Sequence, residues 1–155
     1  MEEENKSDVT GERAKELFLS GFNCAEAVLM AVTESLGVAD DLVPRIATGF
    51  GGGMSGHGYT CGAVTGAVMA AGTVLGRDKP DGDRKQLYAI CSTMMDEFDE
   101  RFSSVACFDL VGVDWRDAEE KARAHKDRVL QEKCVAFVTF AASRIVKFLA
   151  MSREP

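Results

Sequence analysis

Helix start and stop signals divide this sequence, and no segment shows the period-two alternation of a half-buried β-strand. The clearest start is Asn23, an N-cap residue type followed three positions later by Glu26, as in a capping box. Gly37 then supplies a C-terminal stop, as Gly21 and Gly76 do for the neighbouring segments. Helix signals without strand signals predict an all-α fold.

The connections between these segments are short, which predicts a compact bundle of about five to seven helices with a glycine-rich loop. Residues 1–8 are expected to form a flexible tail, and residues 9–155 a single helical domain. Helices are expected over residues 10–20, 24–36, 61–75, 83–102, 114–130 and 134–151, of which the last two could be one helix. Residues 40–48 are expected as a short turn or helix, and residues 107–111 as a short helical turn. Thr60 is the candidate cap of residues 61–75.

The glycine-dense loop covers residues 49–58 and contains a literal match to G-x-G-x-x-G at residues 51–56. A dinucleotide site of that type needs a strand before the loop, and residues 40–48, which include Pro44, lack strand character. We expect the loop to allow close backbone approach instead, with N–H groups directed at ligand sulfurs or a small anion.

Small residues recur at four-residue spacing in the helix expected after this loop, at Gly62, Gly66 and Ala70. Residues four apart share one face of a helix, and small side chains there let another helix approach closely. This face is expected to serve packing and not chemistry.

Composition limits the partners of the chain. Its 155 residues fit one domain, and its net charge of -7 disfavours nucleic acid and anionic membrane surfaces. The acidic N-terminus does not resemble a secretory signal. Arg144 and Lys147 interrupt the most apolar run, residues 135–151, so no membrane span is expected. We therefore expect a cytoplasmic protein with no nucleic-acid or membrane partner.

Five cysteines carry the most informative chemistry: Cys24, Cys61, Cys91, Cys107 and Cys134. In a reducing cytosol, separated cysteines are more often ligands, redox thiols or buried small hydrophobes than permanent disulfides. All but Cys91 fall at expected helix starts, where unpaired N–H groups and the helix dipole favour the thiolate. Cys91 lies in mid-helix and is expected to fill the core.

Cys61 is expected to be the most reactive thiol. It follows the open glycine loop and precedes Gly62 and Ala63, and the helix dipole should lower its pKa below the free value of about 8.5. His57 is a candidate ligand or proton donor nearby, although a lone loop histidine is more often simply solvated.

Four segments resemble a family of redox-active proteins named after a C_GCAxxG_C_C cysteine pattern. They are residues 21–28 (GFNCAEAV), 61–67 (CGAVTGA) and 107–112 (CFDLVG), and Cys134 before an apolar helix. The resemblance covers residues 12–150. Cys61 precedes Gly62, whereas the family name places glycine before cysteine, and Cys91 has no counterpart in the pattern.

The resemblance implies that Cys24, Cys61, Cys107 and Cys134 act together as a redox-type site. Four thiolates suit a [2Fe-2S] cluster, with zinc as the alternative cofactor; without a cofactor the four would be redox thiols. The expected function is iron–sulfur electron transfer or thiol/disulfide exchange with a redox partner protein. The alternatives are a structural zinc domain and a non-enzymatic interaction domain with buried cysteines. Enzymatic activity and assembly into a homo-oligomer stay open.

Overall fold

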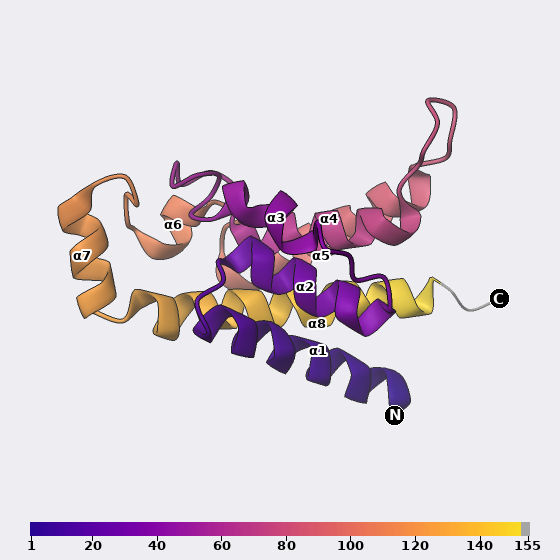
Figure 1. Cartoon of the computed structure of the whole chain (residues 1–155), viewed down its shortest axis with the longest axis horizontal. Coiled ribbons are helices and arrows are strands. Elements are labelled where there is room, and N and C mark those ends of the chain that lie inside the picture. The colour runs from indigo at the N-terminus through magenta and orange to yellow at the C-terminus, as the bar shows by residue number, and fades with distance from the viewer. Residues whose placement is uncertain (153–155) are drawn as a thin grey trace.

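The computed structural model describes residues 1–152, which form eight α-helices packed as a bundle (Figure 1). The helices are α1 (Glu2–Leu19), α2 (Cys24–Leu36), α3 (Val43–Ala47), α4 (Gly62–Leu75), α5 (Lys85–Phe102), α6 (Cys107–Val111), α7 (Ala118–Lys126) and α8 (Val135–Met151). A 3₁₀ turn over Thr48–Phe50 follows α3, and a π-helical turn over Leu130–Cys134 precedes α8. The described residues contain no strand, so the predicted all-α class is confirmed. The count of helices exceeds the predicted five to seven because it includes the five-residue helices α3 and α6.

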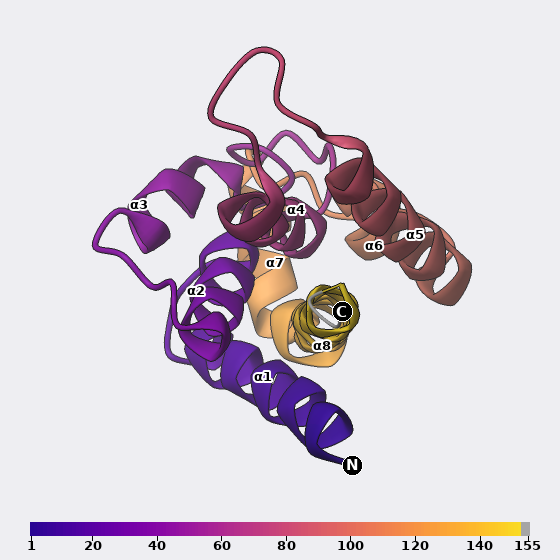
Figure 2. The same cartoon turned by 90° about the vertical axis from the view of Figure 1, so that its right-hand side faces the viewer.

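Helix α8 lies at the centre of the bundle. Figure 2 looks along it, with α1, α2, α4 and α5 arranged around it, and α8 contacts all four. Val138, Ala141, Ile145 and Leu149 are fully buried along its length, at the three- and four-residue spacing of a helix face. This helix therefore organises one shared hydrophobic core.

The expectation that no segment has the length and apolar composition of a membrane span is not met for the segment that contains α8. By length and composition, Leu130–Met151 qualifies as a helix able to cross a membrane, despite Arg144 and Lys147. In the bundle, Arg144 donates two hydrogen bonds to the Glu97 carboxylate of α5. Core helices of globular proteins meet the same criterion, so this feature is weak evidence about a membrane.

The first helix begins earlier than expected. Residues 2–8, expected as a flexible tail ahead of the first helix, form the first two turns of α1. The hydroxyl of Ser7 is buried and donates to the Ser143 carbonyl of α8. A Cβ at Gly11 would collide with the Ser143 side chain, so glycine allows this close contact between α1 and α8. The tertiary contact stabilises a helix start that local signals do not mark.

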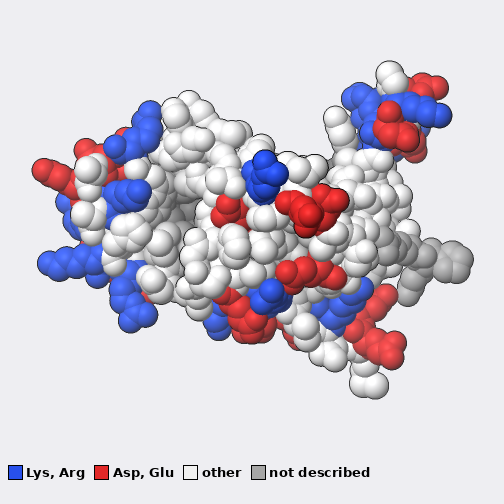
Figure 3. All heavy atoms as spheres, viewed as in Figure 1, with Lys and Arg blue, Asp and Glu red and all other residues white. Residues whose placement is uncertain are grey.

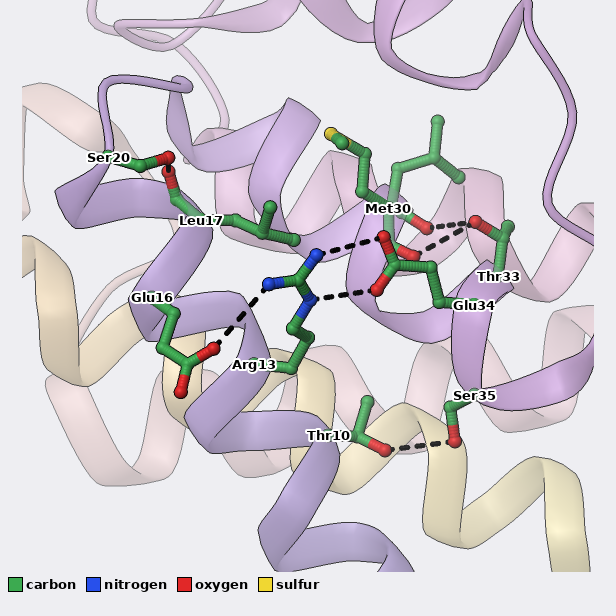
Figure 4. Close-up of polar contacts among 10 residues, drawn as sticks. Thr10, Arg13, Glu16, Leu17, Ser20, Met30, Thr33, Glu34 and Ser35 are labelled. Carbon is green, nitrogen blue, oxygen red and sulfur yellow. Dashed lines mark hydrogen bonds and ion pairs between the residues drawn. The ribbon is translucent and has the colours of Figure 1, made fainter.

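The predicted capping box of α2 is confirmed. Asn23 accepts a hydrogen bond from the Glu26 N–H at 2.9 Å, and the Glu26 carboxylate accepts one from the Asn23 N–H at 2.8 Å. Gly37 ends the helix in the left-handed region, with a φ of 71°. The ion pair between Arg13 of α1 and Glu34 of α2 joins the two helices on their outer side (Figure 4).

The polar segment predicted as a helix over residues 114–130 is shorter in the structure. Asp117 caps α7 by accepting from the N–H groups of Glu119 and Glu120. Arg128, with a φ of 57°, separates α7 from the π-helical turn. The break lets α7 leave the bundle and stand over one end of it (Figure 1).

Cys91 is buried in the core beside Met94 and Phe98, as predicted for a packing residue. The rings of Phe98 and Phe102 lie 5.8 and 4.9 Å from that of Phe137, joining α5 to α8. Cys91 therefore belongs to the interior of the bundle.

Candidate functional site

Four cysteines line one cavity of about 700 Å³. Cys24 and Cys107 are the first residues of α2 and α6, Cys61 directly precedes α4, and Cys134 ends the π-helical turn. Cys91 is not among the lining residues. The structure thus brings together the four cysteines that the sequence grouped and separates the fifth.

Two glycines of α4 allow Cys24 and Cys61 to meet. A Cβ at Gly62 would lie 3.1 Å from the Cys24 Cβ, and one at Gly66 would lie 2.7 Å from the Ala25 carbonyl oxygen. The second distance is shorter than real Cβ contacts allow, and the obstructing atom is backbone. The small-residue face of α4 therefore lets α2 approach closely, as the four-residue spacing predicted.

A short backbone bridge fixes Cys61 next to Cys107. The Cys61 N–H donates to the Val105 carbonyl at 2.8 Å, and the Cys107 N–H donates to the Tyr59 carbonyl at 2.6 Å. Thr60, predicted as a helix cap, pairs with Ala106 in this bridge, and Cys61 takes the N-cap position. Two cysteines 46 positions apart in the numbering are thereby held at the same end of the bundle.

The glycine loop, residues 49–58, leads into this bridge and is held by hydrogen bonds within its own backbone. Six consecutive N–H groups, from Met54 to Tyr59, donate to carbonyls of residues 49–54. These groups are therefore not directed at a ligand, contrary to the expectation for the loop. Gly53 has a φ of 67°, and a Cβ there would come within 2.6 Å of the Cys107 Cβ. Glycine is required at this position by both conformation and space.

Cys24 and Cys134 are in direct contact. The neighbouring Cys134 thiol, followed by burial, raises the pKa of Cys24 well above its ordinary value. Cys134 is held by the π-helical turn, a distortion that inserts an extra residue per turn and often occurs at functional sites.

Burial dominates the electrostatics of Cys61. The side chain is 3% exposed, and this desolvation raises its pKa, helped by the neighbouring Cys24. The N–H groups of Ala63 and Val64 oppose the rise, as expected at a helix start, but their effect is smaller. The prediction of a lowered pKa at Cys61 is therefore wrong.

Trp115 and Cys107 both line the cavity, and the Trp115 indole lies near the Cys107 sulfur. Burial raises the pKa of Cys107, and the indole of Trp115 acts in the opposite direction. Within the described residues, the Trp115 Nε1 is buried and completes no hydrogen bond. The N–H thus lies near the sulfur without bonding geometry, and remains available to a thiolate or to a group bound by it.

Several lining residues were not identified from the sequence: Trp115, Lys121, His125 and Gln131. The four-residue spacing of Lys121 and His125 marks a shared helix face, but their segment resembled an ordinary solvated helix. His57, the histidine singled out from the sequence, is exposed and is not a lining residue; its Nδ1 lies 3.1 Å from the Met54 carbonyl oxygen.

The spacing of the thiols bears on the kind of metal they suit. Within residues 1–152, no three histidine, cysteine or acidic side chains lie close enough together to hold one metal ion. A tetrahedral zinc with Zn–S bonds of about 2.3 Å needs sulfurs only about 3.8 Å apart. An iron–sulfur cluster places its irons and sulfides between the thiolates, so it accepts ligands that are farther apart. The described spacing of the thiols does not match the ligand set of a single tetrahedral ion.

Comparisons with known proteins agree with the cysteine pattern. The model of a family described as "Putative redox-active protein (C_GCAxxG_C_C)" matches residues 22–148, which include all four cavity cysteines. A protein of Archaeoglobus fulgidus, named "Uncharacterized protein", is 34% identical over 121 residues, covering 71% of this chain and 77% of the relative. No solved structure gives a significant match.

Proposed function

This chain belongs to the C_GCAxxG_C_C family, described as redox-active proteins, and from this premise we propose that its four cavity cysteines are the thiolate ligands of an iron–sulfur cluster. The observation that carries the proposal is the convergence of Cys24, Cys61, Cys107 and Cys134 on one cavity from four separate segments. When bound, such a cluster supplies one-electron transfer.

The burial of the thiols favours coordination over exchange. Thiol exchange needs a thiolate, and burial raises the pKa of Cys61 and Cys107, so both are protonated near pH 7. A bound cation reverses this preference, because coordination holds a thiol as its thiolate. The cavity residues thus provide sulfur ligands that are poor nucleophiles without a metal.

The chain's own residues would perform three tasks in this function. The backbone bridge between Thr60 and Ala106 would fix the separation of Cys61 and Cys107. Gly66 would allow the close approach of α2, the helix that carries Cys24. The Trp115 N–H supplies a donor next to the Cys107 sulfur. Hydrogen bonds to ligand sulfurs favour extra negative charge on them and raise the potential of such centres.

The contact between Cys24 and Cys134 supports a second candidate, a dithiol that cycles with a disulfide. Joining the two sulfurs releases two electrons and two protons, and a disulfide of a partner protein would take these up to become two thiols. Structural zinc has less support, because the described thiols form no compact group of three.

The test is anaerobic purification, followed by iron, sulfide and zinc analysis and visible absorption spectroscopy. We expect bound iron and sulfide and a coloured protein. Serine substitution at Cys24, Cys61, Cys107 or Cys134 should remove most of the iron, because each change deletes one ligand. Cys91→Ser is the matched control and should retain the iron, because Cys91 does not line the cavity.

Failure to take up iron and sulfide under argon, in protein shown to be reduced and folded, would refute the cluster. A Cys24–Cys134 disulfide found by peptide mass analysis after mild oxidation would then favour the dithiol. Bound zinc in place of iron would favour the structural alternative.

A further inference from the structure

The cavity differs in charge from the rest of the chain. Within residues 1–152, its lining includes Lys121 and His125 but no carboxylate, although the chain carries 25 acidic residues and a net charge of -7. In Figure 3, charged side chains of both signs gather at the α7 end, and the surface between this end and the body of the bundle is largely uncharged. An anion in the cavity would meet a cation without meeting an acidic side chain.

Lys121 and His125 lie on the same face of α7, and both line the cavity. They are four residues apart, which places both side chains on one side of the helix. No carboxylate of the described residues lies within ion-pair distance of Lys121, and Asp117, four residues before it, binds backbone N–H groups instead. The Lys121 ammonium is therefore available to a ligand.

The remaining walls are largely apolar and aromatic. Phe22, Trp115 and Phe137 line the cavity, and Gln131 adds an uncharged polar group. The volume of about 700 Å³ lies within the range of small-molecule sites. An apolar body with one negative group matches these walls, and an aromatic carboxylate has that form.

We propose that this cavity binds a small organic anion with an apolar body, its negative group at Lys121 and its body against the aromatic wall. Identifying this molecule as the redox substrate rests on the proposed function of the thiols. The binding itself depends only on the cavity and on α7.

Benzoate and its neutral analogue benzamide are suitable probes, titrated into the full chain in its reduced, metal-free form and again after iron loading. Trp115 is the only tryptophan, so its fluorescence reports directly on the cavity, and calorimetry supplies a second readout. We expect benzoate to bind about tenfold more tightly than benzamide, as one charge-assisted hydrogen bond would produce.

Lys121→Met should remove this preference, with circular dichroism showing that the helices persist. Lys126→Met, on the same helix but outside the cavity lining, should leave it unchanged. Equal affinity for the two probes, no binding of either, or an unaltered preference in Lys121→Met would each overturn the anion site. Loss of benzoate binding on iron loading would overturn it as a substrate site. A retained preference in protein that takes up no iron would support the anion site while refuting the cluster.

Discussion

Cys61 stands at the N-terminus of α4, where two opposite effects act on one thiol. The N–H groups of Ala63 and Val64 lower its pKa, and removal from water raises it more. Cys107 shows the same balance, with the Trp115 indole as the opposing group. A helix start favours a thiolate only when the sulfur stays partly hydrated, because losing water penalises charge more than a few N–H dipoles stabilise it.

The raised pKa values predict a loss of stability at alkaline pH. In reduced, metal-free protein, the free energy of unfolding should fall as pH rises above about 8.5, where thiols of the unfolded chain release protons. Folded Cys61 keeps its proton at that pH, so its contribution is complete below pH 8.5 and decreases above it. Urea unfolding at a series of pH values measures the free energy of unfolding, and in Cys61→Ala this free energy should decline less steeply above about pH 8.5. An equally steep decline in Cys61→Ala would contradict the assignment.

Helices α2 and α4 approach as closely as their backbones allow. The contacts of Gly62 and Gly66 with Cys24 and Ala25 leave no space for even one methyl group at Gly66. This approach carries Cys24 to the cavity, so the packing of two helices determines the position of a candidate ligand. Gly72 lies in the same helix but has no neighbour within 4 Å of where its Cβ would be.

Gly66 and Gly72 of α4 form a matched pair for mutation, because only Gly66 is in close contact with another helix. Gly66→Ala should destabilise the fold by about 1–2 kcal/mol, because overpacking against backbone exceeds the gain in helix propensity. Gly72→Ala should stabilise it by about 0.5–1 kcal/mol, because only the propensity changes. Denaturant unfolding measures both. If Gly66→Ala were also stabilising, the close approach of α2 and α4 would be wrong.

The whole molecule depends on α8. This helix contacts α1, α2, α4 and α5, and its fully buried residues join their apolar faces. The π-helical turn that carries Cys134 continues directly into α8. One end of the central helix therefore belongs to the cavity, and the rest organises the core.

A core position and a surface position of α8 should differ strongly. Ile145→Ala should cost about 2–5 kcal/mol, since the side chain is fully buried and its removal leaves a cavity. Met151→Ala, at a position 55% exposed, should change the free energy of unfolding by less than about 0.5 kcal/mol. Urea unfolding monitored by circular dichroism compares them. Similar losses for both variants would argue against α8 as the central helix.

Local features of this protein follow from the sequence. The capping box of Asn23 and Glu26 involves groups three residues apart, so neighbouring residues suffice to specify it. The positions of four cysteines near helix starts and the packing face of Gly62 and Gly66 depend on spacing along one helix, and the structure confirms them. The family pattern added which four of the five cysteines belong together.

Tertiary structure decided the features that depend on distant residues. Residues 2–8 are helical because Ser7 meets Ser143, a partner 136 positions away. Cys61 has a raised pKa because packing removes its water, and desolvation depends on every neighbour in space. Lys121 and His125 belong to the cavity because the break at Arg128 turns α7 over the thiols, whereas in sequence they resemble an ordinary solvated helix. Helix propensity acts between near neighbours, but burial and charge act across the whole fold.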